Sequence, residues 1–166
     1  MLGLNWGASV AERRAPLPCD ELVPDARTRC DRAISVNAPA AVLFRWLCQL
    51  RVAPYSYDVL DNCGRRSPRE LTPGVERLEV GQRFMRIFSL VSFAPDDHLT
   101  LRAPRLAVTY AVRARADRSR LVARVVFKAP GGLLGDALVG RSLALGDLVM
   151  MRKQLLTLKE LAEHRV

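Results

Sequence analysis

The chain has 166 residues, of which 49% are hydrophobic and 26% charged, a composition typical of one globular domain with a substantial core. It contains no apolar run long enough to span a bilayer, and its first residues lack the order of a secretory signal, so we expect a cytoplasmic protein without a transmembrane segment. The formal net charge is +9, but the basic residues are dispersed along the chain, which argues against a specific nucleic-acid site.

Residues 1–27 contain three prolines and no sustained hydrophobic period, so we expect an irregular N-terminal arm that either lies on the domain or is mobile. A single domain should then occupy residues 28–166. Its first element is a strand over residues 28–36, which alternates apolar and polar positions. Asn37 is the expected cap of an amphipathic helix that ends near Leu50.

After a turn-rich segment the hydrophobic pattern changes to period two. Strands are predicted over residues 83–93, 98–103, 106–116 and 120–128, and the short gaps between them predict an antiparallel meander. One face of the meander should be apolar and include Tyr110. The other face should carry outward-pointing polar side chains, namely Thr109, Arg113, Arg115, Arg120, Arg124 and Lys128.

The apolar face of this sheet needs a cover, and a long C-terminal helix over residues 143–164 is the element that the sequence offers. Its apolar stripe consists of Ala144, Leu148, Met151, Leu155, Leu158 and Ala162. Lys153, Gln154 and Glu160 should face water. The glycine-bearing stretch "PGGLLGD" is interpreted as the loop before this helix. The pattern therefore predicts an α+β fold in which a curved antiparallel sheet wraps around a long C-terminal helix.

Five segments carry a resemblance to a known family, namely "ISVNAPAAVLFRWLCQL", "YSYDVLDN", "LEVGQRF", "RLVARVVF" and "MMRKQLLTLKELAE". Together they resemble the polyketide cyclase and lipid-transport branch of the START, or SRPBCC, superfamily, which has the helix-grip fold of the birch-pollen allergen. The resemblance covers Ala33 to Glu163 and implies an internal cavity between sheet and helix. The chain departs from the family at "APYS", where close relatives usually carry a glycine-rich stretch.

The stretch "YSYDVLDN" is the most polar candidate at the mouth of such a cavity. Asp58 and Asp61 could act as an acid and base pair, but Asp61 and Asn62 are also what a capped turn requires, and we favour the turn. Tyr55 and Tyr57 suit the orientation of an amphipathic ligand at a pocket rim. We therefore expect ligand contacts from Trp46, Tyr55, Tyr57, Asp58, Asn62, Tyr110, Met151 and Leu155.

Metal and cofactor chemistry find no support in the sequence. His98 and His164 lie far from a second imidazole or thiol at ligand spacing, the four cysteines form no C-x-x-C pair, and "GGLLG" lacks the ending of a phosphate loop. We expect no metal and no cofactor.

Three functions are compatible with these features. The first is binding or transport of a small, mostly apolar, lipid- or polyketide-like molecule. The second is a polyketide cyclase or aromatase in which Tyr57, Asp58 or Tyr110 would orient or deprotonate a carbonyl compound. The third is a non-enzymatic interaction protein whose basic outer face docks an acidic partner or membrane surface. We favour binding over catalysis, and a homodimer is left open.

Overall fold

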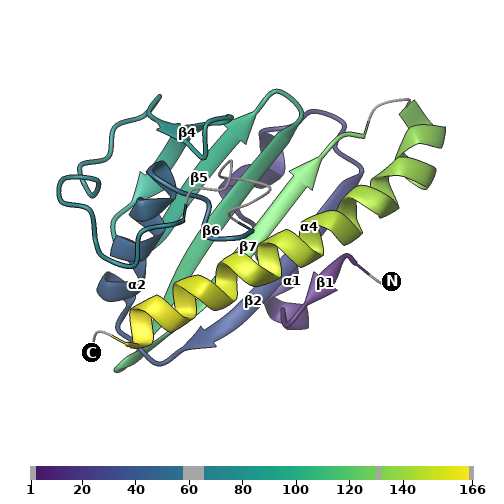
Figure 1. Cartoon of the computed structure of the whole chain (residues 1–166). Helices are drawn as coiled ribbons and strands as arrows, with labels where there is room; N and C mark the ends of the chain where they lie inside the picture. Colours follow the sequence, from purple (N-terminus) through teal and green to yellow (C-terminus); the bar gives the residue numbers. More distant parts are fainter. Residues whose placement is uncertain (1–2, 58–65, 130–131, 165–166) are drawn as a thin grey trace.

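The computed structural model describes residues 3–57, 66–129 and 132–164, with side chains described outside 132–141. Figure 1 shows the long helix α4 (Gly132–Glu163) lying across one face of the sheet. Shorter helical elements are α1 (Val10–Arg14), η1 (Pro18–Glu21), α2 (Ala40–Cys48) and η2 (Gln49–Arg51). The expected helix-grip architecture, a curved sheet gripping a C-terminal helix, is confirmed.

Within the described residues the sheet has seven strands in the order β1-β2-β7-β6-β5-β4-β3. The strands are β1 (Asn5–Trp6), β2 (Thr28–Val36), β3 (Arg83–Phe84), β4 (Phe88–Ala94), β5 (His98–Ala103), β6 (Leu106–Arg115) and β7 (Arg118–Phe127). β1 pairs with β2 in parallel, and the other neighbours are antiparallel. The predicted meander is confirmed because short turns join β4 to β7 in sequence.

The single strand predicted over residues 83–93 is wrong, because the chain turns back on itself between β3 and β4. Met85 and Arg86 both have positive φ, 44° and 64°, and Phe84 pairs with Phe88 across the turn. Two consecutive non-glycine residues in the left-handed region of φ/ψ space raise the free energy of the folded backbone. Burial of Phe84 and Leu90 in the core offsets this cost. Periodicity does not reveal such a turn, because residues 83–93 carry apolar side chains on both faces and contain neither glycine nor proline.

Both helix starts differ from the prediction. Pro39, not Asn37, precedes the first residue of α2, and the Asn37 backbone N–H instead donates to Glu163 Oε1 at 2.6 Å. α4 begins at Gly132, so most of the glycine-bearing stretch read as a loop is helix. Glycine costs a helix about 1 kcal/mol per residue, a penalty that burial of the helix's later apolar face can offset.

The inner core lies between the sheet, α2 and α4. Five of the six residues of the predicted apolar stripe of α4 pack into it, with Leu155, Leu158 and Ala162 fully buried, whereas Leu148 is half-buried outside this cluster. Lys153 and Glu160 face solvent as expected. The prediction for Gln154 is wrong, since this side chain is buried inside the fold.

The outer face of the sheet is covered by the N-terminal segment. A second apolar cluster joins residues of this segment, including Leu17 and Cys19, to sheet residues that include Ala107 and Val122. The segment leaves β1 through Gly7, whose φ is 73° and where an added Cβ would lie 2.2 Å from the Ala33 carbonyl oxygen. Only glycine permits so close an approach of the two backbones.

Three of the residues predicted to point outward do lie on the outer face, but this segment covers them. Thr109 and Arg124 are fully buried, and Arg120 is half-buried. Each has partners in the N-terminal segment: Thr109 Oγ1 accepts from the Cys19 backbone N–H at 3.0 Å, and Arg120 Nε donates to Glu12 Oε1 at 2.7 Å. The alternation of β6 and β7 placed these residues on the correct face, but the sequence did not show that a second layer covers that face.

Candidate functional site

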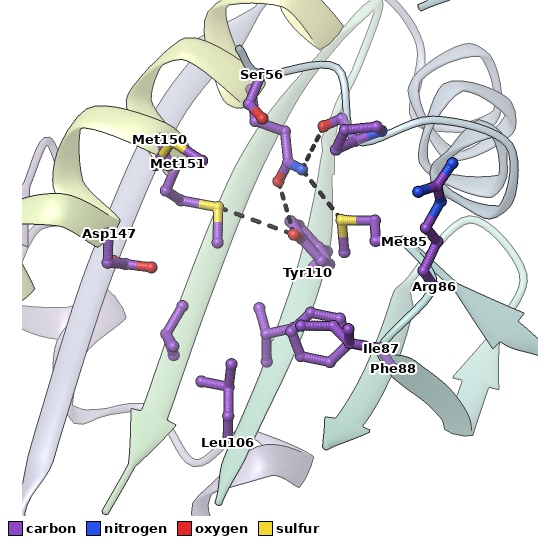
Figure 2. Close-up of a pocket in the computed structure, with 14 residues that line it drawn as sticks. Ser56, Met85, Arg86, Ile87, Phe88, Leu106, Tyr110, Asp147, Met150 and Met151 are labelled. Carbon is purple, nitrogen blue, oxygen red and sulfur yellow. Dashed lines mark hydrogen bonds between the residues drawn. The ribbon is translucent and has the colours of Figure 1, made fainter. Parts of the chain in front are cut away.

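A cavity of about 340 Å³ opens between the inner face of the sheet and α4 (Figure 2). The inner strands β6 and β7 supply its floor, the β3–β4 turn supplies one side, and α4 supplies the other. The lining residues are Pro54, Ser56, Met85, Arg86, Ile87, Phe88, Leu106, Val108, Tyr110, Val125, Asp147, Met150, Met151 and Gln154. The size falls in the range of small-molecule sites, and the walls are mostly apolar with a few polar groups.

The first polar group in the cavity is a pair formed by Tyr110 of β6 and Gln154 of α4. The Tyr110 hydroxyl donates to Gln154 Oε1 at 2.6 Å, and Gln154 Nε2 donates to the Pro54 carbonyl oxygen at 2.6 Å. Burial raises the pKa of the Tyr110 phenol, so this hydroxyl stays protonated and acts as a hydrogen-bond donor. The pair ties the segment after α2 to the middle of α4.

The second polar group is an ion pair between Asp147 of α4 and Arg32 of β2. Arg32 is fully buried, and its Nη2 donates to Asp147 Oδ2 at 2.9 Å and to the Gly3 carbonyl oxygen at 2.6 Å. Burial raises the pKa of Asp147 to about 6, although the Arg32 guanidinium opposes that shift. Figure 2 shows the Asp147 carboxyl group projecting from α4 into the cavity.

A second hollow, of about 400 Å³, adjoins the cavity and shares Leu106, Val125 and Asp147 with it. It continues to Phe127 and Leu143 and reaches the basic side chains of Arg105 and Lys128. Asp147 therefore stands where the two hollows meet.

The structure brings only part of the predicted ligand-contacting set together at this cavity. Tyr110 and Met151 line it. Leu155 and Trp46 are fully buried in the core, and the Trp46 ring meets Tyr55 edge-on with 6.2 Å between ring centroids. Leu155, Trp46 and Tyr55 are not among the lining residues of the cavity.

The polar stretch near Tyr57 is placed differently. Tyr55 borders a separate hollow of about 120 Å³ with Ser67, Lys153 and Thr157, and Tyr57 is 41% exposed. Neither tyrosine lines the main cavity. Asp58 and Asn62, as well as Asp61, lie outside the described residues.

Sequence reasoning missed Arg32, Asp147 and Gln154, although two signals were present. Arg32 lies between Cys30 and Ile34 on the core-facing side of its strand, where a charge requires a buried partner. Asp147 and Gln154 fall at helical spacing from Met151, at four and three residues, and so share its face. A polar residue on a core-facing stripe points to a cavity or to a buried partner.

Among the residues that the structure describes, no group of three or more His, Cys, Asp or Glu side chains is placed to hold a metal ion. No helix in the same part of the chain combines the length and apolar character needed to cross a membrane.

No family model matches the chain, and no curated protein sequence matches it. Solved structures do match. The KanY protein is 14% identical with a TM-score of 0.57, and the alignment covers 82% of this chain and 97% of KanY. Protein MLL2253 from Mesorhizobium loti is 15% identical with a TM-score of 0.51, covering 82% of this chain and 98% of that protein.

A third match is the di-domain ARO/CYC protein BexL from the BE-7585A biosynthetic pathway. It is 17% identical with a TM-score of 0.50, and the alignment covers 81% of this chain and 46% of BexL. At such identities the matches show a shared fold. The fold that the START/SRPBCC resemblance implied is therefore confirmed.

Proposed function

We propose that this protein binds a small, mostly apolar molecule in the cavity between β6, β7 and α4. The observation that carries the proposal is the contrast between the apolar walls and the two polar pairs, Tyr110 with Gln154 and Asp147 with Arg32. Apolar walls provide affinity through burial of ligand surface, and a few fixed polar groups provide orientation. Arg105 and Lys128 line the adjoining hollow, so a ligand with an apolar body and a polar end would fit both hollows.

A thermal-shift screen tests this proposal, with fatty acids, sterols, isoprenoids and aromatic polyketides as the candidate classes. A ligand that binds only the folded state at a hundredfold excess over Kd stabilises it by about 2.7 kcal/mol. For a chain of this size, that gain corresponds to a rise in Tm of roughly 5–10 °C. Native mass spectrometry of freshly purified protein should show a co-purified small molecule.

A blocked cavity supplies the control. Val125 lies on the cavity floor, so Val125→Phe should fill the space and abolish the ligand-induced shift while the protein remains folded. Tyr57→Phe is the matched control, because Tyr57 does not line the cavity and its substitution should leave binding unchanged. A flat screen with an empty mass spectrum, or a shift that survives Val125→Phe, contradicts the proposal.

The second candidate function is a cyclase or aromatase acting on a polyketide-like substrate. The fold shared with BexL favours it, and so does Asp147, whose pKa of about 6 lets it exchange a proton near neutral pH inside the cavity. Tyr110 is suited to donate a hydrogen bond to a carbonyl oxygen rather than to act as a base, because burial raises the pKa of its phenol. Turnover of a linear polyketide mimic that is lost in a folded Asp147→Asn variant would support catalysis. If the mimic is unchanged after prolonged incubation, catalysis is contradicted and ligand binding is the function that remains.

A further inference from the structure

The α4 members of the two polar pairs, Asp147 and Gln154, lie on the same side of the helix, and their spacing sets the distance between the two polar ends of the cavity. Asp147, Met151 and Gln154 all line the cavity and follow one another at spacings of four and three residues. At about 1.5 Å of rise per residue, Asp147 and Gln154 are separated by about 10 Å along the helix axis. Met150, Met151 and Val108 add apolar side chains to the lining of the same cavity.

The Asp147 end can accept hydrogen bonds. Arg32 occupies Oδ2 at 2.9 Å, and a carboxylate has about four lone-pair sites, so acceptor capacity remains on the side that lines the cavity. The Arg32–Asp147 pair is formally neutral, and a cationic ligand would therefore gain little attraction there. A neutral hydroxyl group on the ligand suits this end.

The Gln154 end can donate a hydrogen bond. The Pro54 carbonyl oxygen can only accept, which fixes the amide nitrogen of Gln154 on that side and leaves Oε1 for Tyr110. The remaining contact of Nε2 is Met85 Sδ at 3.5 Å, and a thioether is a weak acceptor. A carbonyl oxygen of the ligand would be a better acceptor than the sulfur and would approach from the cavity side.

From this arrangement we infer that Asp147 and Gln154 select a two-ended ligand, an apolar ring system with a hydroxyl at one end and a carbonyl at the other. The inference rests on the proposed binding function and narrows its ligand class. With a hydrogen bond of about 2.8 Å at each end, the polar atoms of the ligand should lie roughly 5–10 Å apart. One ring or two fused rings with substituents at opposite ends meet that requirement.

Three matched naphthalenes test the inference on the unmodified protein. The first carries a hydroxyl and an acetyl group at opposite ends of the ring system, the second lacks the hydroxyl, and the third lacks the acetyl group. Binding is measured by isothermal titration calorimetry. Loss of the hydroxyl should weaken binding by about 10- to 100-fold, since it removes a hydrogen bond to a charged acceptor. Loss of the acetyl group should weaken it by about 2- to 10-fold, the worth of a neutral hydrogen bond.

A double variant assigns the hydroxyl preference to Asp147. Arg32→Met with Asp147→Leu removes both charges together, so no buried charge is left unpaired. In this variant the first and second compounds should bind within about 2-fold of each other. Asp97→Asn is the matched control, because Asp97 is an exposed carboxylate in the β4–β5 turn that does not line the cavity. It should keep the full preference.

The outcomes separate the inference from the proposed function. If the compounds bind with equal affinity, or if the folded double variant keeps the hydroxyl preference, the two-ended ligand is wrong while a binding cavity stands. If none of the three binds and the wider screen is also flat, the proposed function fails, and the inference fails with it.

Discussion

Arg124 is the residue whose replacement should most clearly show how the N-terminal segment is held. Its guanidinium is fully buried on the outer face of β7 and donates to two carboxylates, Asp31 Oδ1 at 2.7 Å and Asp20 Oδ2 at 2.8 Å. It also donates to three backbone carbonyl oxygens of the segment, those of Glu12, Arg13 and Ala15 at 2.8–3.0 Å. One side chain therefore joins β2, β7, α1 and η1.

We expect Arg124→Met to lower the free energy of unfolding by about 3–5 kcal/mol, the usual cost of removing one partner from a buried ion pair. The cause is that the buried Asp31 carboxylate loses its buried partner and keeps only the more exposed Arg29, while the three carbonyl oxygens lose their donor. The whole stability of a domain is about 5–15 kcal/mol, so the loss is a large fraction. Urea unfolding measures it. With a slope of roughly 2 kcal/mol per molar urea, the midpoint should fall by roughly 1.5–2.5 M.

Limited trypsin digestion supplies an independent measurement, because Arg13 and Arg14 lie in the segment that Arg124 holds. Cleavage there should become faster in Arg124→Met than in the unmodified protein. Arg118→Met is the control, since Arg118 is an exposed arginine on the same strand and its loss should cost within about 0.5 kcal/mol. A cost below about 1 kcal/mol for Arg124→Met, with unchanged cleavage, would refute the role assigned to this residue.

Three further predictions concern α4 and the titratable groups. Leu155→Ala should lower the free energy of unfolding, measured in urea, by about 2–5 kcal/mol because Leu155 is fully buried. The control is Val149→Ala, at a position 53% exposed on the same helix, which should lower it by less than about 0.5 kcal/mol. Equal losses would show that α4 does not dock as described. The hydrogen bond from Arg120 lowers the pKa of Glu12 to about 2. The Glu12 carboxylate should therefore stabilise the folded state by on the order of 1–3 kcal/mol above pH 4.5, and this stabilisation should be lost as the pH falls toward 2. Urea unfolding of Glu12→Gln at several pH values should lack this component. The pH dependence from Asp147 has the opposite sign, because burial raises its pKa to about 6. The folded state therefore binds more protons than the unfolded chain between pH 4 and 6. The stability of the unmodified protein relative to Asp147→Asn should fall by about 3 kcal/mol as the pH rises through that range. A difference that rises with pH would contradict the environment described for Asp147.

Local periodicity by itself determined β2, β5, β6 and β7 and most of the apolar stripe of the C-terminal helix. Alternation placed Tyr110 on the inner face of β6, and three- and four-residue spacing placed Leu155 and Leu158 on the buried side of α4. These features follow from the geometry of a single element, in which side-chain direction repeats every two residues in a strand and every 3.6 in a helix. The helix-grip fold could therefore be inferred before the structure.

Tertiary contacts decided everything that depends on two elements meeting. Gln154 reads as a surface residue until β6 brings the Tyr110 hydroxyl within 2.6 Å of it, and Arg124 reads as an outward charge until the N-terminal segment covers it. The pair of Arg32 and Asp147 joins residues that are 115 positions apart in the chain. No local pattern encodes such a pairing, because a polar group on a buried face can be satisfied by any partner that the packing brings near. The cavity itself is the space left where α4 and the sheet do not close on each other, and only the packed structure defines it.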